Sequence, residues 1–133
     1  MRAPTLLVKD IAVQTPATAL ASETITTCAR RMHAEHVGCL IVVEKNDGNQ
    51  FPVGMLTDRD IAIEVVAFGL DPNALTAGDV MSEKPAVVEE DDDLLDVLAR
   101  MRERGARRLP VTRPDGALAG VIALDNVLEA LGE

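Results

Sequence analysis

Aromatic side chains are nearly absent from this chain, which has two Phe, no Trp and no Tyr among its 133 residues. An aromatic platform on which nucleic-acid bases could stack is therefore excluded. Basic residues are also in the minority, because 13 Lys and Arg stand against 22 Asp and Glu and leave a net charge of −9. Nucleic-acid binding usually depends on a basic surface that neutralises phosphates, so this composition argues against it.

Long apolar runs are missing as well. None reaches the roughly 18 residues that a membrane-spanning helix needs, and the first ten residues lack the pattern of a secretory signal. The two cysteines, Cys28 and Cys39, have neither the spacing of a metal site nor that of a disulfide framework. We therefore expect buried, reduced thiols in a cytoplasmic protein that makes no contact with a membrane.

An internal repeat is the main feature that the sequence does contain. Segments 10–43 and 79–112 align without a gap when the chain is shifted by 69 residues. Beyond these segments the shift falls to 66, so that Gly54 aligns with Gly120, and we expect a turn three residues longer at Glu44–Pro52 in the first copy. This self-similarity indicates two copies of one supersecondary unit.

Each copy has the pattern of a β-α-β-β-α unit. Its first helix is amphipathic, since apolar residues recur at positions 25, 28, 29 and 32 and again at 94, 97, 98 and 101. Ser22 and Asp93 are the expected N-caps of these helices. The expected hairpin pairs Leu40–Val43 with Val53–Leu56 in the first copy and Leu109–Thr112 with Leu118–Ile122 in the second. A second helix is expected to start near Asp58 in the first copy, where it ends at Gly69, and near Asp125 in the second.

The repeat sets the expected domain organisation. Residues 8–69 form the first copy, residues 70–78 link the two, and residues 79–131 form the second copy. The fold class is α/β (α+β). One copy alone buries too little core to be stable, so we expect the two to pack face to face.

The strand–helix junctions carry a string of the form Gly-apolar-apolar-Thr-x-x-Asp. It is intact as Gly54–Asp60, whereas Gly120–Asn126 has Ala123 and Asn126 in place of Thr and Asp. This string, in register on a tandem β-α-β-β-α repeat, resembles the CBS domain family, named after cystathionine β-synthase. The resemblance implies two CBS repeats packed into one pseudo-twofold Bateman module, and the layout is similar to that of small stand-alone bacterial CBS-pair proteins.

The intact string is the first candidate ligand site. A strand that ends at Leu56 and a helix that begins near Asp58 expose backbone N–H groups, and Thr57 can cap that helix or bind an anion. A carboxylate just inside such a helix can accept two hydrogen bonds from a ribose diol, and the resemblance implies that role for Asp60, with Thr57 near the ribose and phosphate and Arg59 beside them. The alternative is that Thr57 and Asp60 only form the capping box of the helix.

Two adjacent arginines form the second candidate site. Arg107 and Arg108, which follow Ala106, offer permanently charged donors suited to phosphate. The resemblance implies that they share a cleft with Asp60 of the other repeat, with Lys84, Pro85 and Ala86 at its base or phosphate end. Alternatively, they pair with surface acids.

The mirror cleft would combine Ala123 and Asn126 with Gly38 and Cys39, and has no charged group in these positions. We therefore expect one cleft to bind a nucleotide and the other not, although independent loss in the two repeats would look the same.

The sequence thus predicts a regulatory module and not an enzyme, because no nucleophile–base pair or catalytic carboxylate pair can be assembled. The implied ligand is AMP, ADP, ATP, S-adenosylmethionine or NAD; the alternative is a ligand-free module that binds a further protein. No metal site is expected, since His33 and His36 lack a third ligand. A homodimer is expected through the apolar second helices, with the residues Ile61, Ile63, Val65, Val66, Phe68, Val127, Leu128 and Leu131.

Overall fold

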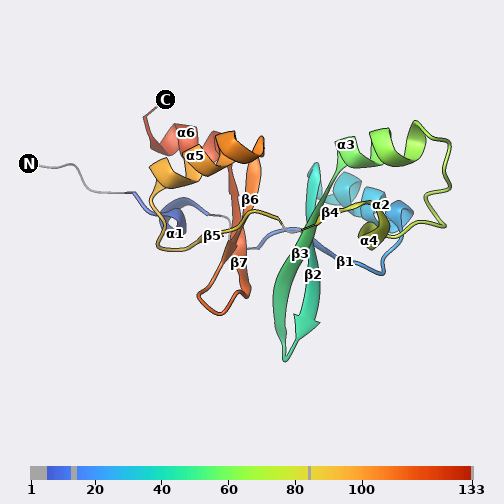
Figure 1. Ribbon diagram of the computed structural model, residues 1–133, viewed down its shortest axis with the longest axis horizontal. Coiled ribbons are helices and arrows are strands. Elements are labelled where there is room, and N and C mark those ends of the chain that lie inside the picture. The colour runs from blue at the N-terminus through green and yellow to red at the C-terminus, as the bar shows by residue number, and fades with distance from the viewer. Residues whose placement is uncertain (1–5, 13–14, 84, 133) are drawn as a thin grey trace, which may run out of the picture. The chain divides into compact units, whose positions relative to one another are not determined.

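The two copies of the repeat build two β-sheets, one in each of two units of the chain (Figure 1). The computed structural model describes residues 6–12, 15–83 and 85–132. The central unit is Pro16–Pro85. The terminal unit joins the described part of Met1–Thr15 to that of Ala86–Glu133.

The central unit contains the expected β-α-β-β-α order and one further helix and strand. Its elements are β1 (Thr18–Leu20), α2 (Ile25–Glu35), β2 (Cys39–Asn46), β3 (Asn49–Thr57), α3 (Asp58–Ile61), the π-helix η1 (Ala62–Val66), α4 (Ala77–Val80) and β4 (Ser82–Glu83). The sheet order is β1-β2-β3-β4, in which β1 runs parallel to β2 and the other pairs are antiparallel.

The terminal unit repeats this arrangement. It consists of α1 (Val8–Ile11), β5 (Val88–Glu89), α5 (Leu94–Arg104), β6 (Arg108–Thr112), β7 (Leu118–Ala123) and α6 (Leu124–Ala130). The sheet order is β5-β6-β7, with β5 parallel to β6 and β6 antiparallel to β7. Figure 1 shows α5 and α6 side by side, and the two helices are in contact.

The periodic apolar positions of α2 and α5 form the core of each unit, as predicted. Side chains at three of the four predicted positions are buried in each helix: Ile25, Cys28 and Met32 in α2, and Leu94, Val97 and Met101 in α5. The predicted cap Asp93 is confirmed, since its side chain accepts a hydrogen bond from the backbone N–H of Leu95 at 2.8 Å. The prediction of Ser22 is wrong: the N-cap is Thr24, whose hydroxyl accepts the N–H of Thr27 at 3.1 Å.

The first hairpin differs from the expected one. Residues Glu44–Pro52 do not form a longer turn, because β2 and β3 continue through most of them and leave only Asp47 and Gly48 between the strands. Both of these residues have positive φ, 50° and 80°, and a two-residue turn of this kind matches the twist of an antiparallel hairpin. The three extra residues therefore lengthen the strands and not the turn.

The short helices α1 and α4 each pack in the unit that contains the other sequence repeat. The N–H of Val8 in α1 donates to the carbonyl of Asp92 at 3.0 Å, and the N–H of Ala77 in α4 donates to that of Glu23 at 2.8 Å. Val8 and Ala77 are fully buried in the respective cores. The sequence copies 8–69 and 79–131 therefore do not coincide with the packing units.

Candidate functional site

Thr57 and Asp60 lie where β3 ends and α3 begins, and they hold each other through two reciprocal hydrogen bonds. The Thr57 hydroxyl accepts the backbone N–H of Asp60 at 3.0 Å, and Oδ2 of Asp60 accepts the backbone N–H of Thr57 at 3.0 Å. The capping box that the sequence offered as the alternative to a ligand site is therefore present.

The capping box does not use all the hydrogen-bonding capacity of Asp60. Among the described residues, the carboxylate receives a hydrogen bond at Oδ2, whereas Oδ1 receives none. Asp60 is half-buried and does not belong to the core of the central unit. An ionised carboxylate has about four lone-pair sites, so cap formation and acceptance of a hydroxyl proton are compatible.

The start of β2 lies next to this junction. Cys39 is the partner of Thr57 in the β2–β3 register, and the N–H of Asp58 donates to the carbonyl of Gly38 at 2.9 Å. A Cβ at Gly38 would meet Oδ2 of Asp58 at 3.0 Å, so a larger residue there would crowd the Asp58 carboxylate. Arg59, the next residue of α3, is exposed.

The two arginines occupy the corresponding place in the terminal unit. Arg108 pairs with Ala123 in the β6–β7 register, and the carbonyl of Arg107 accepts the N–H of Leu124 at 2.8 Å. The Arg107 side chain is 3.9 Å from a carboxylate oxygen of Asp125, with both side chains more than three-quarters exposed. Such an exposed pair contributes little energy, and the guanidinium of Arg108 has no ion pair with a described residue.

The second junction lacks the cap of the first. Ala123 is the N-cap residue of α6 and has no side-chain hydrogen bond to the helix. Asn126 aligns with Asp60 and is also half-buried. At α6 the hydroxyl of the capping box is therefore missing, because Ala123 replaces Thr, and the carboxylate is replaced by the neutral amide of Asn126.

Four predicted site residues remain, and three of them adjoin the boundary between the units in the sequence. Lys84 lies outside the described residues. Pro85 is the last residue of the central unit. Ala86 begins the second segment of the terminal unit and packs against the core of that unit. Ala106 packs against the same core and follows α5. Within their own units, the structure thus brings Thr57 together with Asp60 and Arg107 with Asp125.

A polar network that the sequence analysis missed closes the outer edge of β1. The carbonyl of Thr18 accepts Nη1 of Arg31 at 2.9 Å, and the N–H of Leu20 donates to Oε1 of Glu23 at 2.8 Å. Arg31 and Glu23 are joined by two further hydrogen bonds. Within the described residues β1 is an edge strand that pairs with β2, so these contacts satisfy two backbone groups on its outer edge, the Thr18 carbonyl and the Leu20 N–H. We call the Glu23–Arg31 pair the edge clamp.

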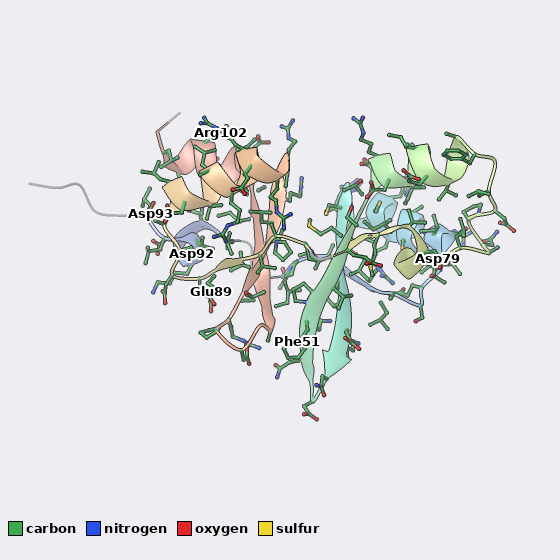
Figure 2. All side chains as sticks on the ribbon, viewed as in Figure 1. Phe51, Asp79, Glu89, Asp92, Asp93 and Arg102 are labelled. Carbon is green, nitrogen blue, oxygen red and sulfur yellow. The ribbon has the colours of Figure 1, made fainter. Side chains whose placement is uncertain are left out.

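The terminal unit repeats the edge clamp 69 residues later. Nη1 of Arg100 donates to the carbonyl of Val87 at 2.6 Å, and Asp92 accepts the N–H of Glu89 at 2.8 Å. The ion pair itself is looser, since Arg100 and Asp92 are 3.8 Å apart. Figure 2 shows Glu89 and Asp92 near the end of α5 where Asp93 caps the helix.

The edge clamp also accounts for the perturbed ionisation in the central unit. The hydrogen bonds from Arg31 lower the pKa of Glu23, against the opposing effect of burial, and the N–H of Leu20 lowers it further. The same pair raises the pKa of Arg31. Burial raises the pKa of the Cys28 thiol, which therefore stays protonated as an apolar core residue.

An open groove beside the edge clamp is separate from Thr57 and Asp60. Its lining residues are Pro16–Leu20, Glu23, Arg31, Glu35, Val43, Lys45 and Gln50. The charged groups on its walls include the two members of the edge clamp, which are already bonded to each other. The groove therefore adds no member to the candidate ligand site.

The predicted dimer surface needs a correction. Val65 and Val127 are fully buried, and Ile61, Leu128 and Leu131 are half-buried. Among the eight predicted residues, Ile63, Val66 and Phe68 are the exposed ones. Within this set of eight, apolar exposure is therefore confined to the segment after β3, because α6 turns its apolar side into the core of the terminal unit.

The described residues contain no cluster of three metal ligands and no helix that could span a membrane. No group of three or more His, Cys, Asp and Glu side chains there is arranged to hold a metal ion. His33 and His36 are both exposed at the end of α2. No helix in the described ranges is long and apolar enough to span a membrane.

Comparison with protein families identifies the repeat. The chain matches the CBS domain twice, over residues 8–67 and 77–133. It is 31% identical to the uncharacterized protein MK0525 of Methanopyrus kandleri over 92% of this chain, and it spans 61% of that protein's length. It is 34% identical to hypoxic response protein 1 of Mycobacterium tuberculosis over 84% of this chain and 75% of that protein.

Solved structures agree with this assignment. The crystal structure of hypoxic response protein I, which contains two coordinated zinc ions, matches 93% of this chain and 98% of its own, with a TM-score of 0.80 and 31% identity. Two more distant structures show the same fold. They are the CBS domain pair of protein MJ0100 with 5′-methylthioadenosine and S-adenosyl-L-methionine (TM-score 0.83, 24% identity, 97% and 98% coverage), and PAE2072 of Pyrobaculum aerophilum with AMP (0.84, 22%, 95% and 98%).

Proposed function

The chain belongs to the CBS domain family, and on that premise we propose that it is a regulatory module that binds an adenine nucleotide or a related adenosyl ligand. Asp60 and Thr57 bind the ribose, and Arg107 and Arg108 bind phosphate. Ligand binding changes the shape of the module or its affinity for a partner through differential affinity for two conformations. The proposal includes no bond-making step.

The observation that carries the proposal is the half-used carboxylate of Asp60. Its Oδ2 is held by the backbone N–H of Thr57 at 3.0 Å, which fixes the position of Oδ1, and Oδ1 has no hydrogen bond to a described residue. A carboxylate oxygen held in this way is a preorganised acceptor for a hydroxyl group. A ribose diol supplies two such hydroxyls side by side.

The proteins with the same fold support the adenosyl part of the ligand. MJ0100 holds 5′-methylthioadenosine and S-adenosyl-L-methionine, and PAE2072 holds AMP. These ligands share an adenosine group and differ in charge at the 5′ position. In this chain, the exposed guanidinium groups of Arg107 and Arg108 favour an anionic 5′ group, because guanidinium binds phosphate oxygens in a bidentate manner.

A thermal-shift series with adenosine, AMP, ADP, ATP, NAD and S-adenosylmethionine tests the proposal. A ligand present at about 100 times its Kd adds roughly 2.7 kcal/mol to the folded state, which raises the unfolding midpoint by several degrees. The proposal predicts a rise with at least one of these compounds and a larger rise with a phosphorylated one than with adenosine.

Asp60→Asn is the matched variant for the same series. Asparagine keeps a side-chain oxygen that can accept the N–H of Thr57, but it lacks the charged acceptor for ribose. Asp79→Asn is the control, because Oδ2 of Asp79 accepts the N–H of Thr76 at 2.9 Å in an equivalent capping box of α4. The ligand-dependent shift should disappear in Asp60→Asn and persist in Asp79→Asn.

A second function is favoured by the missing cap at α6. Ala123 and Asn126 show that a repeat of this fold forms without the Thr and Asp groups, so the module could act as a ligand-free platform for a protein partner. If no adenosyl compound shifts the midpoint of the wild-type chain, this second function replaces the first.

A further inference from the structure

The open groove beside the edge clamp is a cavity that the proposed function does not use. Its volume is about 340 Å³, within the range of sites that bind small molecules. Its walls come from three parts of the central unit, which are the segment Pro16–Leu20, the helix α2 and the β2–β3 hairpin. Neither Thr57 nor Asp60 lines the groove, so a ligand bound there leaves their junction open.

Two charged side chains of the groove have no ion pair with a described residue. They are Lys45 of β2 and Glu35 of α2, and both are exposed. The other two charged residues, Glu23 and Arg31, bind each other in the edge clamp. Gln50 is the partner of Lys45 in the β2–β3 register, and its side-chain amide has no hydrogen bond to a described residue. The groove therefore offers one free cation, one free anion and one free amide.

The fold of a repeat does not require these three side chains. In the second copy Arg104 stands where Glu35 stands in the first. The second hairpin is three residues shorter in the stretch that carries Lys45 and Gln50. That copy nevertheless forms α5, β6 and β7 and keeps the arginine contact to its edge strand. The longer strands of the first hairpin therefore extend one wall of the groove with a cation and an amide.

The free cation lies beyond the end of β1. Strands β1 and β2 are parallel, Leu20 ends β1 opposite Val43, and Lys45 follows two residues later on β2. Lys45 is close enough to the edge clamp to act on it, because its charge adds to the hydrogen bonds from Arg31 in lowering the pKa of Glu23.

The free anion lies toward the start of β1. Arg31 donates to the Thr18 carbonyl where β1 begins. Glu23, which precedes α2, accepts the N–H of Leu20 where β1 ends. Helix α2 therefore runs back along β1, and Glu35, one helix turn after Arg31, lies beyond Thr18. Its charge adds to the hydrogen bonds from Glu23 in raising the pKa of Arg31.

This separation sets the length of a ligand that satisfies both charges. Strand β1 rises about 3.3 Å per residue, so Lys45 and Glu35 are attached on either side of a span of about 7 Å. One extended residue covers only about 3.5 Å, whereas two or three cover about 7–11 Å. Strand addition is not available, because the edge clamp already occupies the Thr18 carbonyl and the Leu20 N–H.

We propose that the groove binds a dipeptide or tripeptide with free termini, its ammonium group at Glu35 and its carboxylate at Lys45 and Gln50. Charge-assisted hydrogen bonds of this kind are among the strong ones. Leu20 and Val43 line the groove at the Lys45 end and favour an apolar carboxyl-terminal residue. The peptide site goes beyond the adenosyl ligand of the proposed function and does not depend on it.

A titration of the isotope-labelled full chain with alanylleucine, followed by two-dimensional NMR, tests the site. This dipeptide has about 14 non-hydrogen atoms, for which the ligand efficiency of ordinary ligands gives a Kd near 1 mM. The amide signals of Leu20 and Lys45 are expected to shift, and those of Thr57 and Asp60 to stay. Free alanine, which is too short to reach both charges, should bind roughly 10-fold more weakly.

Blocking one terminus of alanylleucine at a time identifies the partner of each charge. Acetylation of the amino terminus and amidation of the carboxyl terminus should each weaken binding roughly 10-fold, the scale of a lost hydrogen bond to an exposed charged group. Amidation should cost nothing further in Lys45→Gln, and acetylation nothing further in Glu35→Gln, because the partner is already removed. Circular dichroism should show both variants folded, since both side chains are exposed.

Glu44→Gln is the matched control. Glu44 precedes Lys45 on β2 and is also exposed, but it does not line the groove. This variant and Asp60→Asn are both expected to bind alanylleucine as the wild type does, which separates the peptide site from the adenosyl site.

Three results would each overturn the proposal. The first is that alanylleucine at about 10 mM, ten times the expected Kd, moves no signal of the groove. The second is that the blocked peptides bind as tightly as the free one, or that the amidation loss persists in Lys45→Gln. The third is that Glu44→Gln weakens binding as much as Glu35→Gln does.

Discussion

Replacement of Arg31 in the edge clamp should destabilise the central unit more than replacement of the equivalent Arg100 destabilises the terminal unit. Arg31→Ala deletes a bond to the Thr18 carbonyl and two bonds to Glu23, at a site where the two side chains are 29% and 23% exposed. Hydrogen bonds to charged groups contribute about 1.5–3 kcal/mol, and solvent screening reduces the contribution of each. We expect Arg31→Ala to cost about 2–3 kcal/mol in total.

The copy supplies the internal reference. Arg100 keeps its bond to the Val87 carbonyl, but it is 3.8 Å from Asp92 and the two side chains are 42% and 33% exposed. Arg100→Ala should therefore cost only about 1 kcal/mol. Urea unfolding followed by circular dichroism gives both values. Equal costs, or a larger cost for Arg100→Ala, would refute the idea that the tighter pair is the stronger one.

The pH dependence of this difference provides a second check. Arg31 lowers the pKa of Glu23 in the folded state, so its stabilisation is present above the unfolded value of about 4.3 and is lost as the pH falls through the folded pKa. The stability gap between the wild type and Arg31→Ala should be complete at pH 7 and should shrink below about pH 4. A gap of constant size across this range would show that Glu23 ionisation is not involved.

Three other substitutions test separate parts of the structure. Val8 of α1 is fully buried, so Val8→Ala should destabilise the terminal unit by about 1–3 kcal/mol in urea unfolding. No effect would mean that α1 is not part of that core. Gly54→Ala places a Cβ against Met81 Sδ and 2.8 Å from the Ser82 carbonyl, and should lower the free energy of unfolding in urea by about 1–3 kcal/mol; an unchanged free energy would mean that the two neighbours move aside without cost. Arg108→Ala should weaken the binding of AMP or ATP, measured by calorimetry, and leave the affinity for adenosine unchanged. An equal loss of affinity for adenosine would contradict a phosphate role for Arg108.

The regular elements were predictable because their apolar residues follow a period. Helices α2 and α5 each contain three turns of i, i+3, i+4 spacing, and the core residues Ile25 and Leu94 were found from it. The single-turn helices α1 and α4 are too short for any period to show, and they are held by packing rather than by helix propensity. Their position in the opposite unit therefore had no signal in local sequence.

The length of the first hairpin's strands could not be predicted from the repeat, and the longer turn expected at Glu44–Pro52 is wrong. The shift between two aligned copies does not tell whether three extra residues enter the turn or extend both strands. Strand pairing of Glu44 with Phe51 decided in favour of the strands.

The candidate site was partly predictable. The junction of Thr57 and Asp60 was found from a motif, and its capping box was the stated alternative. The edge clamp was missed because Glu23 precedes α2 and Arg31 lies within it. Neither residue occupies one of the apolar positions from which the helix was predicted, so both looked like ordinary surface residues. The recurrence of an acid and an arginine at positions 92 and 100 was the signal that could have revealed it.

Titration calorimetry on Asp60→Asn tests the central claim most directly, with whichever adenosyl compound stabilises the wild-type chain. The account predicts that Asp60→Asn weakens binding about 10- to 100-fold, the scale of a lost hydrogen bond to a charged group, whereas Asp79→Asn and Asn126→Ala bind as the wild type does. Wild-type affinity in Asp60→Asn, or an equal loss in Asn126→Ala, would contradict the assignment of the ribose site to Asp60.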